Sequence, residues 1–227
     1  MFQGFTEKTG GFLWELAFNN ERPWFLAHKQ EFEDVVNTPF KAMAAETFEQ
    51  LNARCPDFEG RLHVSRIYRD ARRLFGRGPY KDHMWFSIKA SDVLLEGPMF
   101  WFEVGPSEYS FGCGCYSATP VQMDAFRRSI DANPARFLRL AKAAERDGWE
   151  LDGPGYTRPK GSFDDPLLNA WYNRKRVGLS KSFDWGEAGY SPALPQTVVD
   201  GYIQLMDMYK YFMEVYLSCP GEMTRSH

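Results

Sequence analysis

The chain has 227 residues, of which 44% are hydrophobic, 25% charged and 16% aromatic. This composition is typical of a globular protein and excludes a disordered chain. No run approaches the roughly 18 apolar residues of a membrane span, and the first residues lack the pattern of a signal peptide. The four cysteines, Cys55, Cys113, Cys115 and Cys219, are too few for a disulfide scaffold. We therefore expect one domain over residues 1–227, located in the cytoplasm and not bound to a membrane.

The first third of the chain predicts helices. Apolar residues at helical spacing indicate helices over residues 11–18, 23–36 and 39–51. Pro23 and Pro39 suit the first position of a helix, where the missing N–H has no partner to lose.

The middle third predicts strands over residues 62–67, 84–90, 99–104 and 108–116. The last three follow one another through short links, and short links between neighbouring strands favour antiparallel pairing. We expect these three strands to pair antiparallel in one sheet.

The last third returns to helix. Helices are predicted to begin at Pro120, Pro134 and Pro166, a strand covers residues 177–183, and a final helix covers residues 195–217. The broad apolar stripe of that final helix favours packing onto a core, with a short coiled-coil seam between two copies as the alternative. The oligomeric state stays open. The predicted fold class is α+β, a central antiparallel sheet flanked by N-terminal and C-terminal helices.

Charge is unevenly distributed along the chain. The net charge is −3, yet residues 61–89 hold eight basic and two acidic side chains, and residues 156–181 hold six basic and two acidic. The rest of the chain is strongly acidic. An acidic background repels polyanions, which argues against nucleic acid as a partner and favours a local anion site.

The first of these basic islands contains a loop rich in arginine and glycine. Glycines let a backbone approach a ligand closely, and arginine binds phosphate or carboxylate through two parallel hydrogen bonds. The loop is not a P-loop, because Lys81 is followed by Asp82 rather than Ser or Thr. The alternative is a structural ion-pair network in which Asp70 pairs with Arg69 or Arg72. The candidate ligand-binding residues of the two islands are Arg66, Arg69, Asp70, Arg72, Arg77, Tyr80, Lys81, Arg158, Lys160 and Arg174.

Two functions from different classes fit these observations. The first is a protein that binds a small ligand bearing phosphate or carboxylate, with the two basic islands converging on one pocket. The second is an interaction module whose basic loop docks an acidic protein or nucleic-acid partner. Whether the protein is an enzyme stays open, and the sequence identifies no catalytic residue.

Histidine and cysteine offer few further candidates. His83, near the basic loop, is the one histidine suited to acid–base chemistry, although a lone histidine is more often structural. Cys113 and Cys115 would lie on one face of a strand, but a metal site needs four ligands, and neither Cys55 nor Cys219 has a partner two residues away. We expect buried reduced thiols, no metal and no cofactor.

Several sequence pieces occur in an order that resembles a known family. They are Phe12-Leu13, Leu16, Asn19-Asn20, Trp24-Phe25, Tyr68-Arg69-Asp70-Ala71-Arg72, Pro79-Tyr80-Lys81, Gly112-Cys113-Gly114, the helix bearing Arg127, Tyr156 with Arg158-Pro159-Lys160-Gly161, and Asp165-Pro166 before Arg174-Lys175. Together they resemble the uncharacterised family DUF2461 over nearly the whole chain. The resemblance implies no activity, because no accepted catalytic assignment exists in that family.

Overall fold

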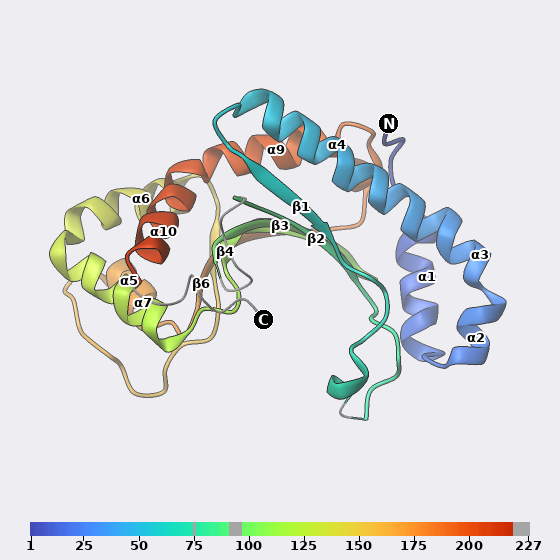
Figure 1. Ribbon diagram of the computed structural model, residues 1–227, viewed down its shortest axis with the longest axis horizontal. Coiled ribbons are helices and arrows are strands. Elements are labelled where there is room, and N and C mark those ends of the chain that lie inside the picture. Colours follow the sequence, from blue (N-terminus) through green and yellow to red (C-terminus); the bar gives the residue numbers. More distant parts are fainter. Residues whose placement is uncertain (75, 91–96, 220–227) are drawn as a thin grey trace. The chain divides into compact units, whose positions relative to one another are not determined.

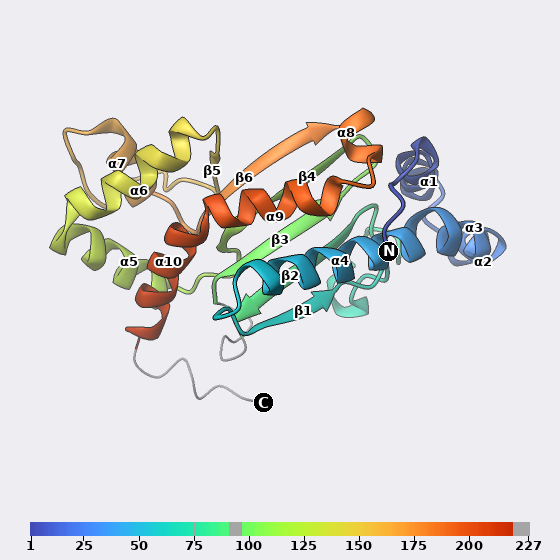
Figure 2. The same cartoon turned by 90° about the horizontal axis from the view of Figure 1, so that it is seen from above.

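The computed structural model describes residues 1–74, 76–90 and 97–219. It has an α+β fold with one six-stranded antiparallel sheet in the order β1-β2-β3-β4-β6-β5 (Figure 2). The strands are β1 (Gly60–Val64), β2 (Met84–Ala90), β3 (Met99–Val104), β4 (Glu108–Cys115), β5 (Glu150–Asp152) and β6 (Val177–Asp184). The predicted fold class and the antiparallel arrangement of β2, β3 and β4 are confirmed.

The chain divides into two compact units. The first unit comprises residues 1–88, 101–111 and 182–200, and the second comprises residues 89–100, 112–181 and 201–227. Each is described by itself below. The single domain expected from the sequence stays a prediction.

Helices of the first unit precede the sheet in the chain. They are α1 (Glu7–Phe18), α2 (Arg22–Ala27), α3 (Lys29–Phe32), a π-helical turn η1 (Glu33–Asn37) and α4 (Thr38–Arg54). The prediction of a single helix over residues 23–36 is wrong, because the helix is interrupted at His28, whose φ of −107° and ψ of 15° lie outside the helical region. In the π-helical turn, the Val35 carbonyl accepts a hydrogen bond of 2.8 Å from the Thr9 hydroxyl. Helix α4 packs along β1 in the same unit (Figure 1).

The core of the first unit is aromatic. Phe40 of α4 lies 5.8 Å from Phe86 of β2 and 6.2 Å from Phe102 of β3, and all three side chains are fully buried. The unit also contains two short elements, the 3₁₀ turn η2 (Ala71–Arg73) and α8 (Glu187–Tyr190).

Helices of the second unit pack against one another. Contacts join α5 (Pro120–Ala132) to α6 (Pro134–Arg146), α6 to α7 (Pro166–Tyr172), and α10 (Met206–Leu217) to both α5 and α6 (Figure 1). Phe137 of α6 lies at the centre of their interface, 5.3 Å from Phe126, 5.2 Å from Trp171 and 5.2 Å from Tyr211.

The final helix is not continuous. The sequence predicts one helix over residues 195–217, but the structure has α9 (Leu194–Gln204) and α10, separated at Leu205 with φ of −89° and ψ of 0°. Leu205 is buried, so the break does not expose it. No helix in the described ranges has both the length and the apolar content that a membrane span requires.

Strands β4 and β6 approach closely in the second unit. A Cβ atom added at Gly112 would lie 1.9 Å from the Leu179 carbonyl oxygen, and one added at Gly114 would lie 2.5 Å from the Gly178 Cα. The two glycines that flank Cys113 are therefore required by the backbone contact between these strands.

Candidate functional site

The arginine-rich loop of the first island is closed at its base by backbone hydrogen bonds. Tyr68 and Tyr80 form an antiparallel bridge, the Arg69 N–H donates to the Pro79 carbonyl at 2.8 Å, and the Lys81 N–H donates to the Ile67 carbonyl at 2.7 Å. The Asn20 side chain adds two bonds to the Tyr80 backbone, each of 2.9 Å. The two chain segments at the base of the loop are thus hydrogen-bonded to each other.

Carboxylates in this loop bind two of its arginines. Asp70 accepts hydrogen bonds from Arg72 Nε at 3.0 Å and from Arg72 Nη2 at 2.8 Å, so these two donors of the guanidinium already have a partner. Arg69 Nε donates to the Tyr80 carbonyl at 2.7 Å, and Arg69 Nη2 lies 3.5 Å from an Asp82 oxygen. Of the two pairings left open by the sequence, Asp70 therefore adopts the one with Arg72.

The remaining candidates of the first island are of three kinds. Arg66 and Arg77 are exposed. Tyr80 is buried and stacks on Phe25 with ring centres 4.1 Å apart, so its ring belongs to the core. Lys81 is half-buried, and burial together with Arg69 and Arg66 lowers its pKa while Glu103 opposes that shift.

The second island is built on α7 and the two segments that flank it. Asp165 caps α7 by accepting from the Leu167 and Leu168 N–H groups at 2.9 and 3.3 Å. Asn173, just after α7, accepts from the Lys160 N–H at 2.6 Å and donates to the Gly161 carbonyl at 3.1 Å. One asparagine side chain therefore holds the loop that bears Lys160.

Backbone pairing positions the other part of this island. The Tyr156 N–H donates to the Asn173 carbonyl at 2.8 Å, and the Lys175 N–H donates to the Pro154 carbonyl at 2.9 Å. Tyr156, Lys160 and Lys175 are consequently brought together although up to 19 residues separate them in the sequence.

Three cations surround the ring of Tyr156. The ring centre lies 5.2 Å from Arg127 Cζ, 5.0 Å from Lys160 Nζ and 5.7 Å from Lys175 Nζ. We call these four residues the Tyr156 cluster. Both lysines are exposed, and neither forms an ion pair with a carboxylate within residues 1–74, 76–90 and 97–219.

Arg127 anchors the cluster from α5. It is 6% exposed and donates to the Tyr172 carbonyl at 3.1 Å, to the Arg174 carbonyl at 3.1 Å and to Asp124 at 2.9 Å. Asp124 is largely exposed, so water screens much of its charge. The guanidinium is thus held in one place, and the cluster keeps a net positive charge.

The other second-island candidates take different positions. The Arg174 side chain donates to the Gly153 carbonyl, which commits its guanidinium to the backbone. Arg158 is exposed. Of the candidates drawn from this island, Lys160 alone belongs to the Tyr156 cluster, and convergence of the two islands on one pocket stays a prediction.

Sequence reasoning did not select Arg127, Tyr156 or Lys175 as ligand-binding residues. One signal for Arg127 was available, because α5 buries Met123, Phe126 and Ile130 on the face that also contains this arginine. A charged residue on an apolar helix face is rarely buried without partners.

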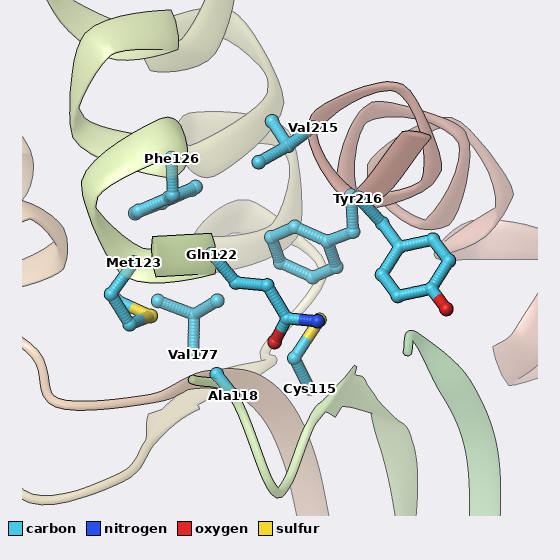
Figure 3. A pocket seen from close by; sticks show the side chains of 9 residues that line it. Cys115, Ala118, Gln122, Met123, Phe126, Val177, Val215 and Tyr216 are labelled. Atoms are coloured by element: carbon cyan, nitrogen blue, oxygen red, sulfur yellow. The ribbon is translucent and has the colours of Figure 1, made fainter. Parts of the chain in front are cut away.

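A small cavity in the second unit does not suit polar chemistry. Gln122 and Cys115 are among the side chains that line a cavity between α5 and α10 (Figure 3). Its volume is about 20 Å³, and its walls are mostly apolar. Burial, with Cys219 nearby, raises the pKa of the Cys115 thiol to about 12, and burial also raises the pKa of Cys113. These thiols are therefore protonated and unreactive at neutral pH.

The cysteines are all free in the described part of the chain. No group of three or more His, Cys, Asp or Glu side chains is placed to hold a metal ion within the described ranges.

The chain has an α+β fold and carries a basic cluster centred on an aromatic ring. The chain matches the family described as "Conserved hypothetical protein (DUF2461)" over residues 8–211, and it belongs to that family. No curated protein matches the chain.

Proposed function

We propose that this protein binds a small anionic ligand, bearing phosphate or carboxylate, at the Tyr156 cluster. The observation that supports the proposal most directly is the gathering of Arg127, Lys160 and Lys175 around one aromatic ring. Three like charges repel one another, and an anion between them offsets that repulsion.

The way the site is held also supports binding. Asn173 and the backbone pairs of Tyr156 and Lys175 position the loop before any ligand arrives. A site positioned in advance loses less conformational entropy on binding, so more of the charge attraction appears as affinity.

Exposure of the two lysines favours a ligand that is reached from solvent. Lysine ammonium groups are compact charges with three donors each, which suits phosphate oxygens. Arg127 acts mainly as a fixed charge beneath the ring, because its hydrogen bonds run to Asp124 and to two backbone carbonyls.

The same exposure supports a second candidate, docking of an acidic segment of a partner protein. Arg158, Lys160 and Lys175 are all exposed, as a docking surface requires. We also propose a cytoplasmic location, which the four free cysteines support.

A thermal-shift screen separates these candidates. Phosphate, sulfate, small dicarboxylates, nucleotides and a glutamate-rich peptide are added in turn to the wild type, Lys160→Met, Lys175→Met and the control Lys210→Met. Lys210 is an exposed lysine of α10, so its replacement makes the same charge change outside the cluster. A small anion at 100 times its Kd stabilises the folded state by about 2.7 kcal/mol.

We expect a small anion to raise the melting temperature of the wild type and of Lys210→Met, and to have a reduced effect on both cluster variants. Stabilisation by the peptide alone favours the docking function. Equal stabilisation of all four proteins, or of none, contradicts the anion site.

A further inference from the structure

The first unit contains a polar hollow that shares no residue with the Tyr156 cluster. It lies where β2 begins and where β3 turns into β4, and its volume is about 170 Å³. Its walls include Asp82, His83, Glu103, Ser107, Glu108 and Ser110. All of these residues belong to the first unit.

Asp82 orients the imidazole of His83. The His83 Nδ1 and an Asp82 oxygen are 3.0 Å apart. An ionised carboxylate only accepts hydrogen bonds, so Nδ1 is the donor and Nε2 of the neutral ring keeps its lone pair. This is the tautomer in which a histidine acts as a base.

Neighbouring groups keep Asp82 ionised. Burial alone raises the pKa of this carboxyl, but the hydrogen bond from His83, a backbone hydrogen bond and the charge of Arg69 bring the pKa below its ordinary value. Arg69 Nη2 lies 3.5 Å from the same Asp82 oxygen that His83 contacts.

Glu103 is in the opposite situation. It sits on β3 between the fully buried residues Phe102 and Val104, and its carboxyl group forms no hydrogen bond or ion pair with the described residues. Burial raises the pKa of its carboxyl, with Asp82 and Glu108 acting in the same direction and His83 and Lys81 opposing it. Glu103 therefore retains its proton to a higher pH than Asp82 does.

We propose that this hollow is a general acid–base site for a small neutral hydroxycarbonyl compound, with His83 as the base and Glu103 as the acid. Two proton-exchanging groups of opposite role line one cavity, as enolisation of such a compound requires. Asp82 and Glu108 disfavour an anionic substrate, whereas the hydroxyls of Ser107 and Ser110 suit a neutral hydroxylated one.

The proton transfers balance without a further reactant. His83 Nε2 removes a proton from the carbon next to the carbonyl, and the C–H electron pair forms a carbon–carbon double bond. The carbonyl π electrons move to oxygen, which takes the Glu103 proton and leaves an enediol. Return of a proton from His83 to carbon, and of the hydroxyl proton to Glu103, restores a carbonyl compound and both side chains.

Exchange of substrate hydrogen for deuterium tests this site directly. Hydroxyacetone, glycolaldehyde and dihydroxyacetone are incubated in D₂O with the wild type, His83→Gln, Glu103→Gln and the control Glu15→Gln. Glu15 is an exposed residue of α1 outside the hollow. Proton NMR follows loss of the hydrogen on the carbon next to the carbonyl.

We expect the wild type and Glu15→Gln to accelerate exchange of at least one compound over buffer, and each hollow variant to lose about 100-fold of that acceleration. If either variant fails to fold, the His83 ring resonances of the wild type are followed while the same compounds are added. Exchange no faster than in buffer, exchange unaffected by both substitutions, or His83 resonances that do not respond overturn the proposal.

Discussion

The guanidinium carbon of Arg127 lies 5.2 Å from the ring centre of Tyr156, and the same guanidinium donates to the carbonyls of Tyr172 and Arg174. One buried side chain of α5 thus joins the end of α7, the segment that follows it and the ring around which the two exposed lysines gather. The Tyr156 cluster is therefore part of the packing of the second unit as well as a candidate ligand site.

Arg127→Met should lower the free energy of unfolding by about 2–4 kcal/mol, because it removes the donor to one buried and one half-buried carbonyl. Urea denaturation measures the change. Arg128→Met is the control, since Arg128 is exposed on the same helix and should change stability by less than about 0.5 kcal/mol. Equal effects of the two substitutions contradict the anchoring role of Arg127.

Gly112→Ala should destabilise the protein by about 3 kcal/mol or more, because the new methyl group would lie 1.9 Å from the Leu179 carbonyl oxygen. Gly11→Ala is the matched control. Gly11 is an exposed residue of α1 with nothing within 4 Å of an added Cβ, so alanine should stabilise the helix by about 0.5–1 kcal/mol. Thermal denaturation of both variants decides whether the close approach of β4 and β6 exists.

Leu205→Ala should lower the free energy of unfolding by about 2–5 kcal/mol, as truncation of a buried leucine does. Leu217→Ala should have a much smaller effect, because Leu217, the last residue of α10, is 47% exposed. If the two variants unfold at the same denaturant concentration, the junction between α9 and α10 does not pack as the structure shows.

Glu103→Gln should stabilise the protein at high pH. The unfolded chain releases the Glu103 proton at its ordinary pKa, whereas burial holds that proton to higher pH in the folded chain. Between the two pKa values the folded state binds more protons, so the free energy of unfolding of the wild type falls as pH rises. Asp82, Glu108, His83 and Lys81 surround the carboxyl and tune this range.

Glutamine removes that loss of stability, so the variant and the wild type should be equally stable at about pH 4 and should diverge as the pH rises to about 8. Urea denaturation at both pH values gives the difference, with Glu15→Gln as the exposed control. A variant that is less stable than the wild type at the higher pH shows that the Glu103 carboxylate has a partner in solution.

The strands β2, β3 and β4 were predictable because their residues are locally distinctive, whereas the three-residue β5 was not predicted. Residues 84–90, 99–104 and 108–115 combine aromatic and branched side chains with short links, and the structure pairs them as expected. The helix breaks at His28 and Leu205 were not predictable, because the apolar spacing of each segment continues through the break. Tertiary contacts such as the hydrogen bond from Thr9 to the Val35 carbonyl act on the backbone, so the spacing of apolar residues does not reveal them.

The residues of the Tyr156 cluster were also only partly predictable from the sequence. Lys160 was selected from local charge, but Tyr156 and Lys175 come together only through pairing of their backbone segments. The sequence left Asp70 with two possible partners, Arg69 and Arg72, because both are close to it in the chain, and only the structure shows the pair with Arg72. Arg127 approaches Tyr156 from a different helix, which local charge does not reveal.

Titration calorimetry with inorganic phosphate tests the anion site most directly. The wild type and Lys210→Met should bind phosphate with equal affinity, and binding should weaken as salt is added. Lys160→Met and Lys175→Met should each weaken binding about tenfold or more, since a hydrogen bond to a charged group contributes about 1.5–3 kcal/mol. Binding of equal strength in all four proteins, or no heat of binding to the wild type at millimolar phosphate, would contradict the Tyr156 cluster as a site for phosphate.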